Sequence, residues 1–512
     1  MNNYRFTAKV PFDSFKFHGL NHRGKSQFSS RMYWFEKIIG MQFFAFDGVY
    51  TNKLIFLLIV VLSYLTSCSN KQESTEVVKP QKPNIIFIMA DDMGYADAGA
   101  YGQKLIKTPN IDQLASEGMR FTQCYSGSSV CAPARSVLMT GQHTGHTRVR
   151  GNFGLGGVVG LGGGEGRVPL REEDVTVAQL LKGAGYTTGM VGKWGLGEPN
   201  TTGEPGRKGF DEFYGFLNQR RAHTYYPDYI WKNKEKVMLN NVDRKGTDYT
   251  HDLFADYTID FITRNKDKPF FLYIPFCIPH DSYELPDNGE YENKPWDKKA
   301  KAYAAMVSRM DKNVGRIIQT LKEAGIDDNT YVFFTSDNGA AESSVEWGLF
   351  DSNAPLRGIK RDPYEGGMRV PMIVRNPNKI DAGKTNDLAW YFADVLPTLA
   401  EIANVTSPKN IDGVSVLPTL HGKQQDLSGR SLYWEFYEKQ GWRATHFGDW
   451  KAIQNGMNLG DQEPIELYNL KDDISEKNNL ADQHPEIIAK AASIFKESHV
   501  PSEHFVWKYL NK

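Results

Sequence analysis

Cysteine is scarce in this chain. Its 512 residues include only Cys68, Cys124, Cys131 and Cys277. Four cysteines are too few to build a disulfide framework in a chain of this length. Cys124 and Cys277 lie in apolar surroundings, so we expect them to be buried thiols. Cys68 and Cys131 each stand in a distinct motif.

An excess of charge of either sign is also absent. Lys and Arg number 60, Asp and Glu number 61, and the formal net charge is -1. A general nucleic-acid binder needs a basic surplus, so we expect no nucleic-acid partner. The glycine-rich stretch 154–166 lacks the Gly-Lys-Ser/Thr ending of a phosphate-binding loop. Hydrophobic content of 40% is ordinary for a globular protein, and the length permits more than one domain.

The chain has no apolar run long enough to span a bilayer comfortably. The run at 54–62 has the length of a signal-peptide core, and Leu65-Thr66-Ser67-Cys68 looks like a bacterial lipobox. We therefore expect an exported bacterial lipoprotein, in the periplasm or on the outer membrane or cell surface, held by an N-terminal lipid anchor. A membrane anchor helix and a plain secretion signal are the alternatives.

The segment upstream of this run is too long for a signal peptide. Residues 1–52 are best explained by a mis-assigned start codon, with Met32 or Met41 as the true initiator. The expected organisation has four parts: a leader at 1–68, a polar linker at 69–82, a large domain at 83–420 and a C-terminal subdomain at 421–512.

Two apolar segments end in pairs of polar side chains. One precedes Asp91 and Asp92, and the other precedes Asp337 and Asn338. Adjacent carboxylates are costly unless a cation neutralises them. Ligand sites of open α/β sheets lie at the carboxyl ends of the strands. The repeated pattern therefore predicts a metal site built from both segments.

Strands and helices alternate through most of the chain, which predicts an α/β fold with a mostly parallel sheet. Short aromatic strands beyond residue 420 predict a smaller antiparallel sheet with one terminal helix. The expected strands are 187–191, 270–274, 331–335 and 372–375, then 431–436, 444–447, 450–453 and 466–468; the expected helices include 249–264, 298–324, 388–402 and 486–497.

The motif Cys131-Ala132-Pro133-Ala134-Arg135 predicts a helix that begins near the cysteine. Proline suits the first turn of a helix, so Cys131 should lie at the helix N-terminus. That end carries partial positive charge and free N–H groups, which favour a bound anion. Lys193 and His280 each follow an apolar strand and are further candidates for the same site.

Together these motifs resemble the type I, formylglycine-dependent sulfatases of the alkaline phosphatase superfamily, in particular the arylsulfatase and N-acetylgalactosamine-6-sulfatase branch. The resemblance runs from about Pro83 to the C-terminus. It implies a large mixed, mostly parallel sheet sandwiched by helices, followed by the small antiparallel sheet and helix. The motifs are Asp91-Asp92, Cys131-x-Pro133-x-Arg135, Gly192-Lys193-Trp194, Pro279-His280, Ser336-Asp337-Asn338-Gly339 and Gly358-Ile359-Lys360 before Tyr364-Glu365-Gly366-Gly367.

The resemblance implies a cofactor and a modification. A maturation enzyme would oxidise Cys131 to formylglycine, whose hydrate would be both nucleophile and metal ligand. One calcium ion would be bound, and oxygen-only ligands leave magnesium possible. The implied metal ligands are Asp91, Asp92, Cys131, Asp337 and Asn338.

The resemblance also implies catalytic roles for four other residues. Arg135 would stabilise the hydrate, and Lys193 and Lys360 would hold sulfate oxygens. His280 would protonate the departing alcohol oxygen.

One departure stands out, because the family usually has Lys-x-His where this chain has Lys193-Trp194-Gly195. The missing histidine normally assists release of sulfate. We expect His143 or His146 to replace it, because both follow the Cys131 helix closely; His223, Asp337 and water are the alternatives. The candidate substrate-facing residues are His143, His146, Arg148 and His223.

The sequence therefore predicts hydrolysis of sulfate esters, with a sulfated saccharide as substrate. We expect galactose or N-acetylgalactosamine sulfate. Two other functions remain open. One is a related metal-dependent phosphoesterase, which usually has two zinc ions and a Ser or Thr nucleophile. The other is a non-catalytic glycan-binding protein on a sulfatase fold, for which the change at Gly195 is the only indication.

Overall fold

The structure is a computed structural model that describes residues 82–154, 167–459 and 463–507. The predicted leader, the lipobox and the linker up to residue 81 lie outside these ranges, as does most of the glycine-rich stretch. No helix among the described residues is both long enough and apolar enough to cross a membrane.

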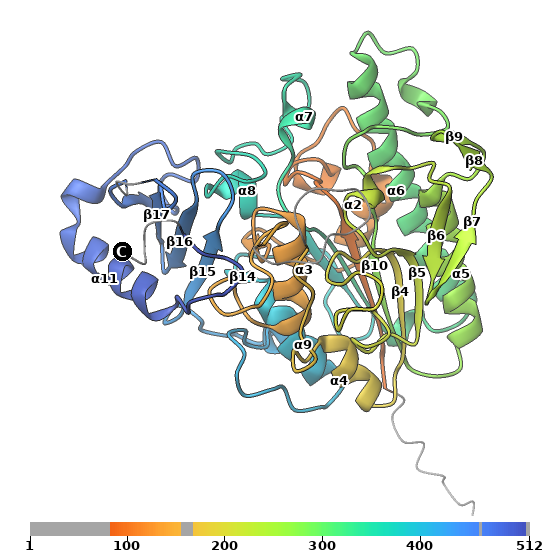
Figure 1. Cartoon of the computed structure of the whole chain (residues 1–512), viewed down its shortest axis with the longest axis horizontal. Helices are drawn as coiled ribbons and strands as arrows, with labels where there is room; N and C mark the ends of the chain where they lie inside the picture. Colours follow the sequence, from red (N-terminus) through yellow and green to blue (C-terminus); the bar gives the residue numbers. More distant parts are fainter. Residues whose placement is uncertain (1–81, 155–166, 460–462, 508–512) are drawn as a thin grey trace, which may run out of the picture. The chain divides into compact units, whose positions relative to one another are not determined.

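A ten-stranded mixed sheet forms the centre of the fold (Figure 1). Its five middle strands are parallel, in the order β11-β1-β10-β4-β5, while β12, β6 and β7 join in antiparallel pairing. The strands are β1 (Asn84–Ala90), β2 (Met119–Phe121), β4 (Thr187–Lys193), β5 (Glu212–Phe216), β6 (Tyr229–Lys232), β7 (Glu235–Met238), β10 (Phe270–Pro275), β11 (Thr330–Ser336), β12 (Met372–Arg375) and β13 (Lys384–Asn386).

Helices cover both faces of this sheet because its central strands are apolar on both sides. In β1 every residue is buried, and alternate side chains enter different cores: Phe87 belongs to one and Ile88 to the other. The Phe87 face carries α3 (Cys131–Thr140), α4 (Val177–Gly183) and α9 (Val395–Ile402); the Ile88 face carries α2 (Pro109–Ser116), α5 (Thr250–Asn265) and α6 (Lys298–Glu323).

The last part of the chain forms a four-stranded antiparallel sheet with one long helix. Trp434 of this sheet donates from its indole Nε1 to the carbonyl of Ser126 at 2.9 Å, which ties the sheet to the segment before Cys131. The elements are β15 (Ser431–Phe436), β16 (Trp442–Phe447), β17 (Trp450–Asn455), β18 (Glu466–Asn469) and α11 (Pro485–Glu497). The predicted fold class is confirmed.

Two predicted segments differ from the structure. The segment 210–230, where no strand was predicted, contains β5, which extends the parallel sheet beside β4. The helix expected at 388–402 begins only at Val395. Its first residues form β14 (Trp390–Tyr391), which pairs with β3 (Cys124–Tyr125), and a 3-10 turn η5 (Phe392–Asp394). The carboxylate of Asp394 accepts from the N–H groups of Tyr391 and Val414 and fixes this turn.

Several short elements complete the fold. They are η1 (Gly99–Tyr101), η2 (Arg221–His223), β8 (Asn241–Val242), β9 (Lys245–Gly246), η3 (Gly289–Tyr291), η4 (Asp327–Asn329), α7 (Glu342–Val345), α8 (Glu365–Met368), α10 (Leu417–Leu420) and η6 (Ala481–Gln483). Because the five middle strands of the large sheet are parallel, their carboxyl ends share one edge, and the loops leaving that edge form the site.

Candidate active site

Acidic side chains meet where β1 and β11 end. These strands pair in parallel with Ala90 opposite Ser336, so the residues that follow them are neighbours. The backbone N–H of Asp92 donates to Asp337 Oδ1 at 3.1 Å. Asn338 Nδ2 donates to Asp92 Oδ1 at 2.7 Å. The predicted juxtaposition of the two segments is present, and all of these side chains are buried.

Three buried cations surround these carboxylates. Lys193 Nζ, at the end of β4, lies 2.6 Å from Asp91 Oδ2. Lys360 Nζ lies 2.6 Å from Asp92 Oδ1. The guanidinium of Arg135, on α3, donates to Asp337 Oδ2 at 2.7 Å and to the carbonyl of Lys193 at 2.6 Å.

The pKa values of the carboxyls show how crowded the cluster is. Burial works against ionisation of Asp91, but the charges of Lys193 and His280 hold its pKa well below the usual value. Burial and the nearby Asp91 charge raise the pKa of Asp337 to about 6. The cations therefore stabilise the ionised form of Asp91, and the charge of Asp91 in turn disfavours ionisation of Asp337.

The donor set fits a hard divalent cation. Asp91 Oδ1 and Asn338 Oδ1 are buried and accept no hydrogen bond. Ligand atoms of Asp91, Asp92, Cys131 and His280 all lie within 4.8 Å of one another. Unpaired buried acceptors are costly, and carboxylate and amide oxygens are the ligands that calcium and magnesium prefer.

Cys131 is the first residue of α3 and is 2% exposed. The prediction that it begins this helix is confirmed. The next N–H, of Ala132, donates to Asn152 Oδ1 at 3.1 Å. Burial raises the pKa of the Cys131 thiol. A protonated thiol is a weak nucleophile, so the unmodified side chain is poorly suited to attack an ester.

Two histidines face each other beside the cysteine. The rings of His223 and His280 are stacked with centroids 3.7 Å apart. His280 Nε2 lies 3.3 Å from Asp92 Oδ2, and its Nδ1 lies 2.7 Å from Asp281 Oδ1. His223 Nε2 lies 3.4 Å from Lys193 Nζ. Because an ammonium group can only donate, His223 presents an Nε2 lone pair toward the cluster.

The expectation for His143 and His146 is contradicted by their position. Both follow α3 at its C-terminal end, and ten helical residues separate that end from Cys131 by about 15 Å. His143 Nε2 lies 3.6 Å and His146 Nδ1 2.8 Å from Asp412 Oδ1.

Arg148 also lies apart from the predicted catalytic residues. Its Nε donates to the carbonyl of Pro169 at 3.2 Å, and its Nη2 lies 2.7 Å from His504 Nε2. Of the four substrate-facing candidates, the structure brings only His223 to the site.

The structure explains why glycine stands at position 195, where the family usually has histidine. Gly195 has a φ of +80°, which favours glycine, and a Cβ there would lie 2.6 Å from the Gln219 side chain. Gln219 follows β5 and donates from Nε2 to Asn152 Oδ1 at 3.0 Å. The loop after β5 therefore fills the space beside Gly195. Sequence reasoning missed Gln219 because nothing in its local pattern marks it.

The catalytic pocket has a volume of about 420 Å³. Its walls include Asp92, Cys131, Asn152, Phe153, Arg167, Gln219, Arg220, His223, His280, Asp281, Ala341, Glu342, Lys360 and Arg361.

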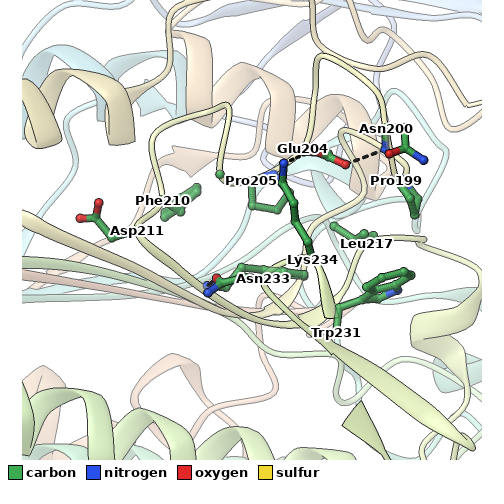
Figure 2. Close-up of a pocket in the computed structure, with 12 residues that line it drawn as sticks. Pro199, Asn200, Glu204, Pro205, Phe210, Asp211, Leu217, Trp231, Asn233 and Lys234 are labelled. Carbon is green, nitrogen blue, oxygen red and sulfur yellow. Dashed lines mark hydrogen bonds and ion pairs between the residues drawn. The ribbon is translucent and has the colours of Figure 1, made fainter. Parts of the chain in front are cut away.

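A second cavity, of about 390 Å³, is lined by the segment between β4 and β6 and by residues at the end of β6. Figure 2 shows Glu204 in this cavity. Its carboxylate accepts a hydrogen bond from the backbone N–H of Asn200 and forms an ion pair with Lys234. Its lining contains none of the predicted catalytic or metal-binding residues.

The mixed sheet, the helices on both faces and the acidic cluster at the strand ends define an α/β fold of the alkaline phosphatase-like type. The chain belongs to the sulfatase family, whose model matches residues 83–405, and it is a sulfuric ester hydrolase. A second model, N-sulphoglucosamine sulphohydrolase, C-terminal, matches residues 345–497.

Relatives agree with this assignment. The chain is 32% identical over 397 residues to N-acetylgalactosamine-6-sulfatase of Homo sapiens, covering 73% of this chain and 72% of the relative. It is 27% identical over 531 residues to N-acetylgalactosamine-6-O-sulfatase of Bacteroides thetaiotaomicron, covering 85% and 96%. The solved structure of Ps i-CgsB in complex with k-i-k-neocarrahexaose superposes with a TM-score of 0.71 at 29% identity, covering 82% and 93%.

Proposed function

We propose that this enzyme removes sulfate from a carbohydrate, with galactose or N-acetylgalactosamine sulfate as the substrate. The observation that carries the proposal is the convergence of Cys131, at a helix N-terminus, with Lys360 and His280 around a buried carboxylate cluster. Two similar proteins are named as N-acetylgalactosamine-6-sulfatases, and a similar structure holds an oligosaccharide, which supports a sugar substrate.

The family's two accessory groups fit the residues present. A formylglycine at position 131 supplies, as its hydrate, an oxygen nucleophile, and a calcium ion supplies positive charge for the sulfate. Asp91, Asp92, Asp337 and Asn338 would hold the ion through their oxygens, two of which have no hydrogen-bond partner. Magnesium would suit the same donors.

The protein's own side chains supply the remaining work. Arg135 holds Asp337 and the Lys193 carbonyl, so it fixes the end of β4 against the carboxylates. Lys193 and Lys360 bind sulfate oxygens and offset the charge that develops on them. His280 Nε2 donates a proton to the leaving alcohol oxygen. Asp281, 2.7 Å from Nδ1, holds the ring in place.

His223 takes the role of the missing family histidine. Its Nε2 lone pair accepts the proton that is given up when sulfate is released. Burial, together with the charges of His280 and Lys193, lowers the pKa of His223 well below the usual value, so the ring is neutral. Gln219 occupies the space beside Gly195, and the ring of His223 approaches from the same loop.

The proposal is tested by the chemical state of residue 131. Mass spectrometry of the tryptic peptide Phe121–Arg135, from protein purified out of its native host, should show the aldehyde in place of the thiol. The same preparation should hydrolyse 4-nitrophenyl sulfate, and Cys131→Ala should not. An unmodified thiol in an active enzyme would refute the formylglycine mechanism. An intact aldehyde without turnover would favour the glycan-binding alternative.

Export, lipid anchoring at Cys68 and maturation by a formylglycine-generating enzyme belong to the same proposal. They are supported by the apolar run at 54–62, the lipobox-like Leu65-Thr66-Ser67-Cys68 and the Cys-x-Pro-x-Arg motif. N-terminal sequencing of the mature protein tests the anchor, because a free N-terminus upstream of Cys68 would exclude it.

A further inference from the structure

The catalytic pocket carries more positive charge than one sulfate ester requires. Besides Lys360, its walls include Arg167, Arg220 and Arg361. A sulfate monoester has a single negative charge, and the proposed mechanism already gives it two lysines and a metal ion. The arginines on the pocket wall therefore add positive charge that the single sulfate group does not require.

Arg361 is held in place by its backbone. It follows Lys360 directly and has a φ of +81°. Its N–H donates to the carbonyl of Ser129 at 3.0 Å, and its carbonyl accepts from Trp442 Nε1 at 2.9 Å. These contacts come from the segment before Cys131 and from the C-terminal sheet. The backbone of Arg361 is therefore fixed from two sides at the pocket wall.

Arg167 is anchored on the wall that adjoins Cys131. Its guanidinium lies 4.3 Å above the Phe153 ring centroid and donates to the carbonyl of Asn152. Asn152 is the residue whose side chain receives the N–H of Ala132. Burial lowers the pKa of the Arg167 guanidinium, and the charges of Glu198 and Glu438 act in the opposite direction.

Nearby acids act on these two arginines through their charge, Glu198 and Glu438 on Arg167 and Glu438 on Arg361, but without a direct contact. Glu342 and Asp281 also line the pocket, and Asp281 is bound to His280. Glu438 accepts from the N–H of Asn152. Among the described residues, no carboxylate forms an ion pair with Arg167 or Arg361. Both guanidinium groups thus keep donors available for an anionic ligand.

We propose that Arg167 and Arg361 form a subsite for a second anionic group of the substrate. The ligand class is a saccharide with another sulfate or a uronate carboxylate, on the sulfated sugar or on its neighbour. Guanidinium groups bind both oxyanions through paired N–H donors. This subsite rests on the proposed function, because it recognises the part of a sulfated saccharide that is not hydrolysed.

Binding to a non-reacting variant tests the subsite without turnover. Calorimetry with Cys131→Ala compares N-acetylgalactosamine 6-sulfate, N-acetylgalactosamine 4,6-disulfate and a disaccharide in which a uronate adjoins N-acetylgalactosamine 6-sulfate. At least one two-anion compound should bind about tenfold more tightly than the one-anion compound, which corresponds to one good charge-assisted contact. Which compound gains affinity distinguishes a sulfate from a carboxylate as the second anion.

Arginine variants in the same Cys131→Ala background assign the gain to these residues. Arg361→Gln and Arg167→Gln should each reduce the affinity ratio between the two-anion and one-anion compounds. Arg264→Gln, on α5, removes an arginine that pairs with Glu212 outside the pocket and is the matched control. A ratio that stays the same in both pocket variants would overturn the proposal.

Failure of the subsite is distinguishable from failure of the proposed function. If neither two-anion compound binds more tightly than the one-anion compound, including the case where none binds, the subsite is overturned. Hydrolysis of 4-nitrophenyl sulfate by the wild-type enzyme reports separately on sulfatase chemistry. An active sulfatase without the affinity ratio would therefore reject only the second-anion subsite.

Discussion

His280 lies between two acidic side chains, Asp92 at Nε2 and Asp281 at Nδ1. In the proposed mechanism the ring donates a proton from Nε2 to the leaving group. The proton matters most when the departing alkoxide is strongly basic, as for a sugar hydroxyl. It matters less for a nitrophenolate, which leaves without assistance.

His280→Gln should therefore lower kcat on a sugar sulfate by about 10²–10⁴-fold. The loss on 4-nitrophenyl sulfate should be much smaller. Steady-state kinetics on both substrates measures the difference. An equal loss on the two substrates would contradict a role as general acid.

His223→Gln should slow a later step. The first turnover of 4-nitrophenyl sulfate should stay fast, because the variant retains Lys193, Lys360 and His280, while steady-state turnover should fall by about 10²-fold or more. Rapid-quench kinetics separates the two phases. His421→Gln, on a histidine that contacts Tyr331, is the control. Loss of the first turnover, or an unchanged steady-state rate, would reject the proton acceptor role.

At this scale the sequence predicts residues that follow apolar strands, because the strand end fixes their position. Asp91, Asp337 and Lys193 are of this kind. Sequence-based prediction fails for the histidine that replaces the family histidine. His143 is twelve positions from Cys131 but is carried away along the length of α3, whereas His223 returns to the cluster after a strand that was not predicted.

At the scale of elements, a buried charge cluster joins the large sheet's loops to the C-terminal sheet. Lys451 on β17 lies 2.9 Å from Glu365 on α8 and 3.0 Å from Glu476. Burial opposes ionisation of Glu365, but Lys451 and Arg369 lower its pKa to about 2. Burial raises the pKa of Glu476 to about 7. The cluster therefore holds one firmly ionised carboxylate and one that prefers its proton.

The pKa shifts of Glu476 and Glu365 make the free energy of unfolding depend on pH with opposite signs in two different pH ranges. The native state holds the Glu476 proton from about pH 4.5 to 7, where an unfolded chain releases it, so stability falls as pH rises through that window. Glu365 contributes stability above pH 4.5 that is lost as pH falls toward 2.

Glu476→Gln should flatten the decline in Tm between pH 5 and 7 relative to wild type. Calorimetry across that range checks it. Glu486→Gln, on the exposed face of α11, is the control and should follow the wild-type curve. A wild-type-like decline in the Glu476 variant would show that another group controls this window.

Element prediction succeeded where apolar periodicity is strong. The expected helix at 298–324 matches α6 to one residue, and the strand at 372–375 matches β12. It failed in 210–230 because β5 mixes aromatic and polar residues at the less buried side of the sheet. It also failed at 388–394, where the side chain of Asp394 satisfies backbone N–H groups and so competes with a longer helix.

At the scale of the whole molecule, the acidic cluster sits where β1 and β11 meet, and a metal ion there would stabilise the centre of the sheet. Calcium bound only by the native state raises Tm in proportion to the logarithm of its concentration above Kd. The effect should therefore appear in the global unfolding transition, because the site joins two central strands of the sheet.

Chelator should therefore lower Tm and abolish sulfatase activity together, and added calcium should restore both. Asp92→Asn should weaken the dependence of Tm on calcium. Asp256→Asn, at an ion pair with Arg316 on the surface of α5, should leave that dependence as in wild type. A Tm that does not respond to chelator or calcium in the wild-type protein would contradict the metal site.

The burial of Cys131 bears on when the proposed modification can occur relative to folding. The thiol is 2% exposed, and the residues that enclose it include Asp337 and Lys360, which are synthesised some two hundred positions later. A pocket sized for a sugar does not admit another protein's active site. If Cys131 is modified as proposed, its oxidation would have to come before the second half of the sheet closes, and a chain that folded first would keep the thiol.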